Sequence, residues 1–175
     1  AVLRILKKYK DWSAYVVGDE PRDKLNFKHK RLKNFGFKEH KEVISIYKKT
    51  SIAVVCSRWD EPFGRTSLEA AANGCAVIIS NRGGLPETIT NGRILKKLNV
   101  NEIYKNIEDL IKNSSIRKKY QKLSYKNFYL SHEYVSEQID KVRNNLSKIS
   151  KPFLSKSQSN LRILHITNFN ERHNG

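Results

Sequence analysis

The sequence contains little of several residue types that would indicate other classes of protein. Among its 175 residues there are no methionines, two cysteines and four prolines. Two cysteines, Cys56 and Cys75, are too few for the disulfide framework of a small secreted domain, and both lie in apolar runs. We therefore expect buried, reduced thiols and a cytoplasmic protein. Because there is no initiator methionine, we also expect the sequence to be incomplete.

Long hydrophobic runs and clusters of metal ligands are also missing from the sequence. The longest apolar stretch is far shorter than the roughly 20 residues that cross a bilayer, and there is no secretory signal peptide. The five histidines are scattered, and the cysteines do not have the spacing of a zinc site. These features argue against a membrane-spanning protein and against a metal centre.

Negative charge is scarce relative to positive charge. Lysine and arginine total 34 and aspartate and glutamate 17, which gives a formal net charge of +17. Such a charge attracts nucleic acids and anionic lipids at low salt. The lysines are spread over all predicted helices and loops, however, and no recognised nucleic-acid-binding motif accompanies them. We predict no specific nucleic-acid partner. A peripheral contact with the inner face of an anionic membrane is an alternative that the charge leaves open.

Strand and helix patterns alternate along the chain, which is typical of an α/β protein with a parallel sheet and helices on both faces. Between Gly92 and Leu146 the pattern predicts only helices, the first of them capped at Asn101. The tyrosines and phenylalanine of residues 120–134 are expected to pack these helices against the sheet; stacking on nucleic-acid bases is the less favoured alternative. The predicted strands are residues 13–17, 32–35, 52–56 and 76–79; the predicted helices are residues 2–9, 42–47, 66–73, 101–111, 116–123 and 135–146.

Residues 57–87, SRWDEPFGRTSLEAAANGCAVIISNRGGLPE, contain the most informative pattern. Glu61 lies in a turn that ends at Gly64, and Glu69 lies about one turn inside the helix that follows. The first turn of a helix offers unpaired amides and a positive dipole end, so a phosphate can dock at Gly64, Arg65 and Thr66 while Glu69 accepts sugar hydroxyls. This arrangement suits a nucleotide sugar. Taken singly, Glu61 could equally be a solvated loop residue, and Glu69 a favourable charge in the helix dipole.

A second loop, at Gly83 and Gly84, follows the next predicted strand. Ligands of open α/β sheets bind at the carboxyl ends of the strands, so we expect both loops to meet at one crevice. The two glycines would allow close approach of backbone to a ligand, although a plain strand-to-helix turn is an equal alternative. Arg82 could reach a phosphate, but solvation is the more common state of such an arginine.

Together these residues resemble the signature of retaining glycosyltransferases of family 4, whose donor-binding domain carries EPFG, a second glutamate eight positions later, and GGxPE. Two departures are Ala72, where methionine is common, and Ala76, where proline is usual. Neither touches the predicted site. The matching residues are Glu61, Pro62, Phe63, Gly64, Glu69, Gly74, Gly83, Gly84, Pro86 and Glu87.

The resemblance implies one Rossmann-like half of a GT-B fold and the transfer of a sugar with retention of configuration. It implies that Glu61 is the catalytic residue facing the sugar and that Glu69 binds the ribose, with no metal and no cofactor beyond the nucleotide-diphosphate sugar. The acceptor would be a glycan or a lipid-linked molecule in cell-surface polysaccharide or lipopolysaccharide synthesis. A catalytically inactive nucleotide-binding or regulatory module and a basic nucleic-acid-binding domain are the alternatives. The remaining donor-binding residues would be Phe63, Gly64, Arg65, Thr66, Arg58, Gly83 and Gly84.

The predicted domain organisation follows from these patterns. Residues 1–146 form the donor-binding domain, residues 147–160 a linker rich in serine and lysine, and residues 161–175 a terminal strand and loop. Because the chain opens on a helix, the strand expected at the centre of a doubly wound sheet is missing between residues 13–17 and 52–56. We hypothesise that residues 161–166, of this chain or of a neighbouring copy, fill this place; otherwise they begin another domain.

Overall fold

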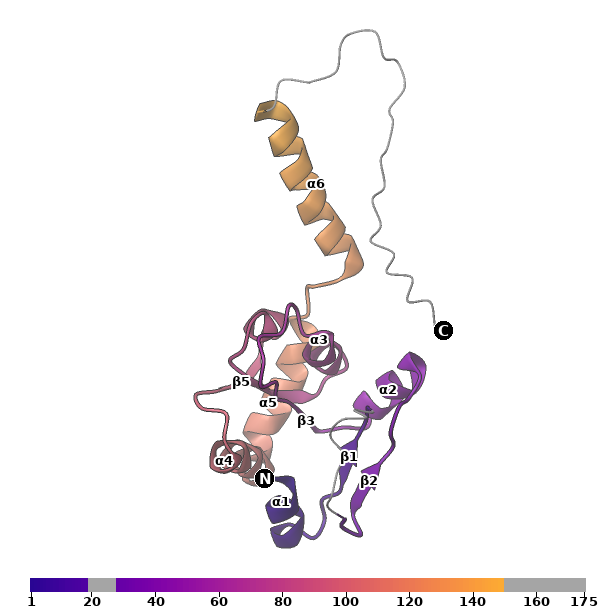
Figure 1. Cartoon of the computed structure of the whole chain (residues 1–175), viewed down its shortest axis with the longest axis vertical. Helices are drawn as coiled ribbons and strands as arrows, with labels where there is room; N and C mark the ends of the chain where they lie inside the picture. Colours follow the sequence, from indigo (N-terminus) through magenta and orange to yellow (C-terminus); the bar gives the residue numbers. More distant parts are fainter. Residues whose placement is uncertain (19–27, 150–175) are drawn as a thin grey trace, which may run out of the picture. The chain divides into compact units, whose positions relative to one another are not determined.

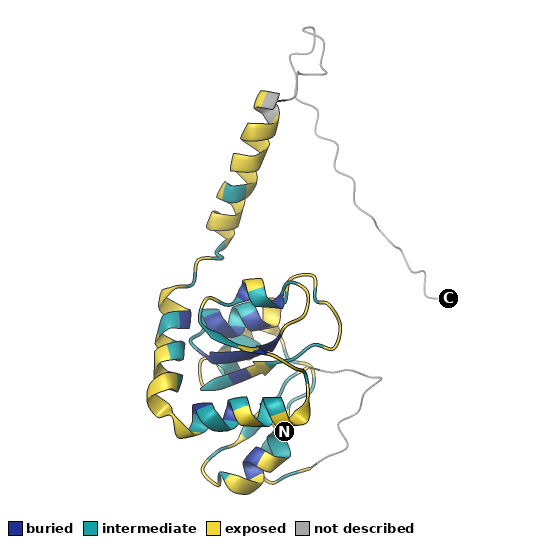
Figure 2. Cartoon of the chain, turned by 90° about the vertical axis from the view of Figure 1, so that its left-hand side faces the viewer, coloured by how far each residue is buried: buried dark blue, intermediate teal, exposed yellow. Residues whose placement is uncertain are grey.

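The computed structural model describes residues 1–18 and 28–149, which fall into two compact units on either side of Ser131. The first unit contains every strand in the described part of the chain, together with helices α1 to α5 (Figure 1). The second unit contains α6, His132–Ile149, which is exposed along most of its length (Figure 2). The helices of the first unit are α1 (Val2–Lys8), α2 (His40–Tyr47), α3 (Arg65–Ala72), the short 3₁₀ helix η1 (Leu85–Thr88), α4 (Val100–Lys112) and α5 (Ser114–Lys126).

All the described strands pair in parallel, which confirms the predicted α/β class. Strand β1 (Ala14–Val16) pairs with β2 (Leu32–Asn34), and a second sheet has the order β3 (Ile52–Val55), β4 (Ala76–Ser80), β5 (Gly92–Leu95). The prediction that the chain is purely helical between Gly92 and Leu146 was wrong, because residues 92–95 form β5. Only Ile94 and Leu95 in this segment favour a strand, so its conformation depends on pairing with β4.

Strand β4 is buried at all five positions and separates two layers of helices. Val77 and Ile79 pack with Ala70 and Leu85 of the α3 and η1 layer. Ala76 and Ile78 face the opposite way and pack with residues of α1 and α4, including Ile5, Ile107 and Leu110. Since successive side chains of a strand point to opposite faces, the continuous apolar run of β4 is what a strand covered on both sides requires.

The amphipathic helix α4 is capped by Asn99 and not by Asn101. The Asn99 side chain accepts a hydrogen bond from the Glu102 amide at 2.9 Å, and the helix begins at Val100. Asn101 instead accepts a hydrogen bond from Arg4 Nη1 at 2.7 Å, and so links α4 to α1, which lies beside it (Figure 1). Both residues are asparagines at the start of one apolar pattern, so only the backbone geometry distinguishes them.

Two predictions about burial need correction. Tyr120 packs against the core, but Tyr125, Tyr129 and Tyr134 are largely exposed, because these positions lie on the outer face of α5 and beyond it. Cys75 is fully buried as predicted, whereas Cys56 at the end of β3 is only partly buried. Burial raises the pKa of the Cys56 thiol to about 11 and that of Cys75 to about 12, so both stay protonated at neutral pH.

The two sheets are not paired with each other, so β1 and β3 are both edge strands among the described residues. This is the place where the sequence predicts a missing strand. Residues 161–166, predicted to fill it, lie outside the described residues.

Candidate functional site

The loops that follow β3 and β4 lie against each other, as the sequence predicts. The Gly84 amide donates a hydrogen bond of 2.7 Å to the Glu61 carbonyl. Gly83 has a φ of +52°, and a Cβ at this position would clash with the Glu61 backbone. A Cβ at Gly84 would lie 2.7 Å from the Pro62 carbonyl oxygen. The diglycine is therefore needed for contact between the two loops, which a plain strand-to-helix turn would not require.

A buried serine fixes the start of the first loop. The Ser80 hydroxyl, at the end of β4, accepts from the Ser57 amide at 2.9 Å and lies 3.1 Å from the Ser57 carbonyl. Ser80 is 1 % exposed. Ser80 is not among the site residues predicted from the sequence. The feature that could have identified it is a hydroxyl side chain at the end of an otherwise aliphatic strand, because a buried polar group there needs a hydrogen-bond partner.

Helix α3 begins at Gly64, which adopts a left-handed conformation with a φ of +89°. The first bond within the helix runs from the Leu68 amide to the Gly64 carbonyl, so the amides of Arg65 and Thr66 have no acceptor within the helix. No side chain caps this end. The turn therefore presents free amides and the positive end of the helix dipole, as the predicted phosphate site requires.

Glu69 lies one turn into α3, with its side chain 21 % exposed. Its Oε1 is 3.3 Å from Arg65 Nη2 and 3.8 Å from His40 Nδ1, at the start of α2. Burial is the main cause that raises the pKa of Tyr47 to about 12, and the negative charge of Glu69 is the second cause. His40 and Tyr47 were not predicted as neighbours of the site, because no local pattern connects α2 with α3.

Glu61 is partly buried, and its carboxylate makes no hydrogen bond or ion pair with any residue of the described ranges. Only its backbone carbonyl is bonded, to Gly84. An acidic side chain without a protein partner, in a loop fixed by its own backbone, is available to a ligand. Along the chain, Glu61 precedes the amides of Arg65 and Thr66 at the start of α3, and Glu69 follows them one turn later.

The remaining predicted residues lie in the same loops but are more exposed. Phe63 is 43 % exposed, and the Arg65 side chain is 76 % exposed despite its contact with Glu69. Arg82 Nη1 lies 4.0 Å from Asp60 Oδ1, so it joins the second loop to the first. Arg58 is exposed and forms no ion pair within the described part of the chain. These arginines place positive charge in loops that also carry Asp60, Glu61, Glu69 and Glu87, so the loop region has no excess of positive charge.

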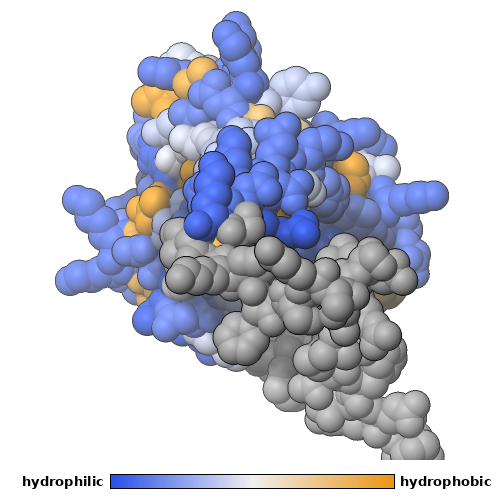
Figure 3. Space-filling view, turned by 90° about the horizontal axis from the view of Figure 1, so that it is seen from above, coloured by the Kyte–Doolittle hydropathy of each residue, from blue (hydrophilic) through white to orange (hydrophobic). Residues whose placement is uncertain are grey.

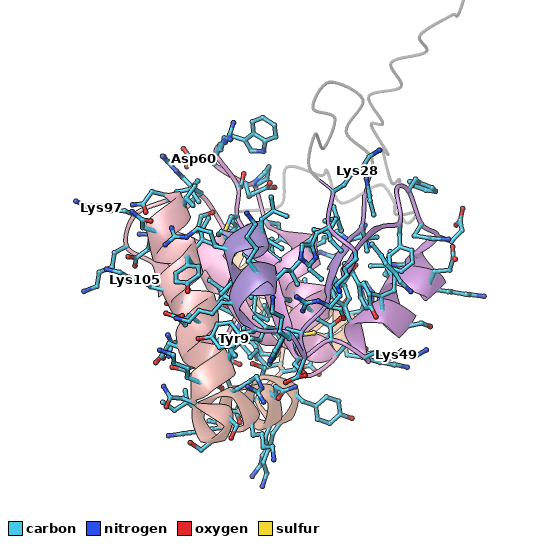
Figure 4. All side chains as sticks on the ribbon, turned by 90° about the horizontal axis from the view of Figure 1, so that it is seen from below. Tyr9, Lys28, Lys49, Asp60, Lys97 and Lys105 are labelled. Atoms are coloured by element: carbon cyan, nitrogen blue, oxygen red, sulfur yellow. The ribbon has the colours of Figure 1, made fainter. Side chains whose placement is uncertain are left out.

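The positive charge elsewhere is distributed around the molecule. In Figure 4, Lys97 and Lys105 lie on one side of the molecule, and Lys28 and Lys49 lie on the other. In the view of Figure 3, hydrophobic side chains are scattered among hydrophilic ones. Within residues 1–18 and 28–149, no three or more histidine, cysteine or acidic side chains are grouped to hold a metal ion. No helix in those ranges is both long and apolar enough to cross a bilayer.

The parallel sheets with helices on both faces have the Rossmann-like architecture of one half of a GT-B fold. The chain belongs to the family of glycosyl transferases group 1, whose family model matches residues 1–127. The match spans all the strands and both loops described above, and it confirms the family resemblance found in the sequence.

Similar proteins support the same assignment. The chain is 36 % identical over 92 residues to spore coat protein SA of Bacillus subtilis, covering 50 % of this chain and 24 % of that protein. The C-terminal domain of a group 1 glycosyl transferase (LpcC) from Francisella tularensis is 34 % identical, with a TM-score of 0.63 over 71 % of this chain and 72 % of that chain. Anabaena HepE in complex with UDP and glucose has the same fold at 21 % identity, with a TM-score of 0.59, covering 76 % of this chain and 40 % of that one.

Proposed function

We propose that the chain is the donor-binding half of a retaining glycosyltransferase, which transfers a sugar from a nucleotide-diphosphate sugar to a glycan or lipid-linked acceptor. One observation carries this proposal: Glu61, the free amides at the start of α3, and Glu69 follow one another along a single rigid turn. A donor consisting of sugar, diphosphate and ribose has the same linear order of groups. The HepE complexes with UDP and UDP-glucose support a uridine nucleotide as the first donor to test.

Glu69 would accept hydrogen bonds from the ribose hydroxyls. A carboxylate has two oxygens that accept hydrogen bonds, which matches a pair of neighbouring hydroxyls. In the structure Glu69 is oriented by Arg65 and His40, both of which leave part of the carboxylate exposed. Phe63, which is 43 % exposed in the turn before α3, would contact the donor.

The diphosphate would dock at the amides of Arg65 and Thr66, next to Gly64. The exposed guanidinium groups of Arg65 and Arg58 would add positive charge where the phosphate leaves. Amides and arginines can stabilise this charge without a metal ion, so we expect transfer to continue in the presence of a chelator. Glu61 would orient the sugar. The acceptor would attack from the same face of the sugar that the phosphate leaves, and the leaving phosphate oxygen would take the proton of the acceptor.

The pathway and location are further parts of the proposal. We infer a role in cell-surface polysaccharide or lipopolysaccharide assembly, at the cytoplasmic side of the membrane, on the basis of the family and of the spore coat relative. The net charge of +17 favours weak contact with anionic lipid. Sedimentation with vesicles containing phosphatidylglycerol, compared with phosphatidylcholine alone, tests this contact.

The decisive experiment is calorimetric titration of the chain with UDP, GDP and ADP, followed by the sugar conjugates of whichever nucleotide binds. Selective binding of one nucleotide, strengthened by a sugar, supports the enzyme. Binding of a nucleotide with no effect of any sugar would indicate a nucleotide-binding module. If no nucleotide binds while DNA or RNA binds with a steep dependence on salt, the donor-site proposal is wrong.

A further inference from the structure

Helix α5 has an outer face whose charge is entirely positive. The helix carries five basic residues and no acidic residue, whereas α4 and α6 each carry both signs. Because an α-helix turns by about 100° per residue, its four lysines lie within an arc of about 100° and span about 12 Å along the axis. All four are exposed: Lys118, Lys119, Lys122 and Lys126.

The opposite face of α5 holds the helix in place. Ser124 is fully buried, and its Oγ donates a hydrogen bond of 2.6 Å to the Asn91 carbonyl. Arg117, the fifth basic residue, donates to two carbonyls near the end of α4 and lies over the Trp12 ring. Exposed residues run along the outer side of α5, the helix that precedes the link to α6 (Figure 2). Arg117 is thus used within the fold, whereas the four lysines are not.

No acidic side chain neutralises these lysines. Within residues 1–18 and 28–149, none of the four forms an ion pair or a side-chain hydrogen bond. The acids of α4, which packs against α5, are engaged elsewhere: Glu108 pairs with Lys8, and Asp109 pairs with Arg93. Four unpaired ammonium groups on one helix face repel each other, so this face attracts a surface that carries many negative charges.

The form of the face favours a lipid bilayer as that surface. The outer side of a single helix is convex, and a row of lipid headgroups can contact all four lysines together. Tyr125 lies beside the lysines and is 69 % exposed, and tyrosine prefers the interface between membrane and water. Single-stranded nucleic acids are instead held in grooves. The arc also contains no arginine, asparagine or glutamine, which read the bases of a duplex.

We propose that the outer face of α5 is the surface through which the chain docks on an anionic bilayer. The ammonium groups of the lysines contact lipid phosphates, and the Tyr125 ring lies at the level of the headgroups. This docking face rests on the membrane contact proposed above and is independent of the donor site. It concentrates in four lysines an attraction that the net charge of +17 by itself would spread over the whole molecule.

The test is co-sedimentation of the 175-residue chain with vesicles of phosphatidylcholine that contain about one third phosphatidylglycerol, at low salt. An α5 variant has all four lysines of the face replaced by glutamine. A control variant has four exposed lysines of other elements replaced in the same way, so that both variants lose the same charge. The control substitutions are Lys33→Gln, Lys48→Gln, Lys49→Gln and Lys97→Gln.

Each lysine close to an anionic leaflet contributes about fivefold to the partition coefficient. We therefore expect the α5 variant to lose at least about 25-fold in binding, which corresponds to two lysines in full contact, and the control variant to lose less than about threefold. The unmodified chain should not bind phosphatidylcholine alone. Thermal unfolding of both variants should match that of the unmodified chain, because every substituted side chain is exposed.

Equal losses in the two variants would overturn the docking face, because binding would then depend only on net charge. A larger loss for a short DNA duplex than for vesicles would identify nucleic acid as the occupant and would also overturn it. If the unmodified chain does not bind the anionic vesicles, both the membrane contact and the docking face are wrong. The nucleotide titration described above tests the donor site separately from all these outcomes.

Discussion

The hydroxyl oxygens of Ser67 and Thr88 lie 2.6 Å apart in the core and join α3 to η1. Ser67 Oγ is also 2.8 Å from the Gly64 carbonyl, and Thr88 Oγ1 is 2.7 Å from the Leu85 carbonyl. Two hydroxyl protons serve three short contacts, so at most two of these are hydrogen bonds at one time. The pair fixes the turn that begins α3 to the loop that follows β4.

Removing either hydroxyl should destabilise the protein. Ser67→Ala and Thr88→Val should each lower the free energy of unfolding by about 1–3 kcal/mol, because a buried polar group loses its partner. The double variant should lose less unfolding free energy than the sum of the two single losses, because each single variant already removes the interaction that the two hydroxyls share. Urea unfolding of the four proteins gives the coupling energy. Strict additivity would show that the two hydroxyls act independently.

Glu69→Gln should weaken binding of the nucleoside diphosphate by about 1–3 kcal/mol, which is about 5- to 150-fold in Kd. The amide retains one acceptor oxygen in place of two and loses the charge that attracts Arg65 and His40. Calorimetry measures the change, with Glu102→Gln on α4 as a control of the same chemistry outside the site. An unchanged affinity would remove Glu69 from the donor site.

Glu61→Gln should leave the affinity for the free nucleotide nearly intact. It should reduce the additional affinity that the sugar gives to the nucleotide sugar, and it should reduce transfer wherever turnover can be measured. The reason is that Glu61 is assigned to the sugar, whereas the amides and Glu69 hold the nucleotide. The measurement is the ratio of the two dissociation constants. Equal losses of nucleotide affinity in the Glu61 and Glu69 variants would contradict this division of roles.

Gly64→Ala should cost stability as well as nucleotide affinity. A Cβ at Gly64 would lie 2.5 Å from Leu85 Cδ2, a fully buried side chain, in addition to the strain of a positive φ. Gly36 also has a positive φ, but its Cβ would meet nothing within 4 Å. Gly36→Ala should therefore cost about 1 kcal/mol from backbone strain alone, and Gly64→Ala clearly more. Similar losses in the two variants by thermal unfolding would show that the clash is relieved.

Glu108 should make the protein sensitive to acid. Its carboxylate accepts hydrogen bonds from Lys8, Tyr9 and Tyr104, which lower its pKa from 4.5 to about 2 and connect α1 with α4. Because the pKa is lower in the folded state, this contribution to stability is complete above about pH 4.5 and is lost as the pH falls toward 2. The difference in unfolding free energy between the wild type and Glu108→Gln should shrink over this interval. A difference that is independent of pH would refute the assignment.

The donor-site motif could be predicted because its signals are local. A glycine turn before a run of helix-forming residues predicts where α3 begins, and an aliphatic run predicts that β4 is covered on both faces. Glu61 and Glu69 acquire their positions from these two features. The structure confirms that the two loops meet, although it shows that Gly83 and Gly84 are required by contact between the loops themselves.

Other parts of the site could not be read from local patterns. His40 approaches Glu69 only because α2 and α3 pack on the same face of the sheet. Ser80 and Thr88 look like ordinary polar residues until the structure shows their buried partners. Strand β5 has a weak intrinsic preference and exists through its pairing with β4.

The sequence by itself determined the α/β class, the family and the positions of the two glutamates, because each depends on spacing within about thirty residues. The tertiary structure decided which side chains orient Glu69 and why the diglycine is needed. These features join residues that are far apart in the chain. Their free energy comes from packing and hydrogen bonds that exist only after the sheets and helices have assembled.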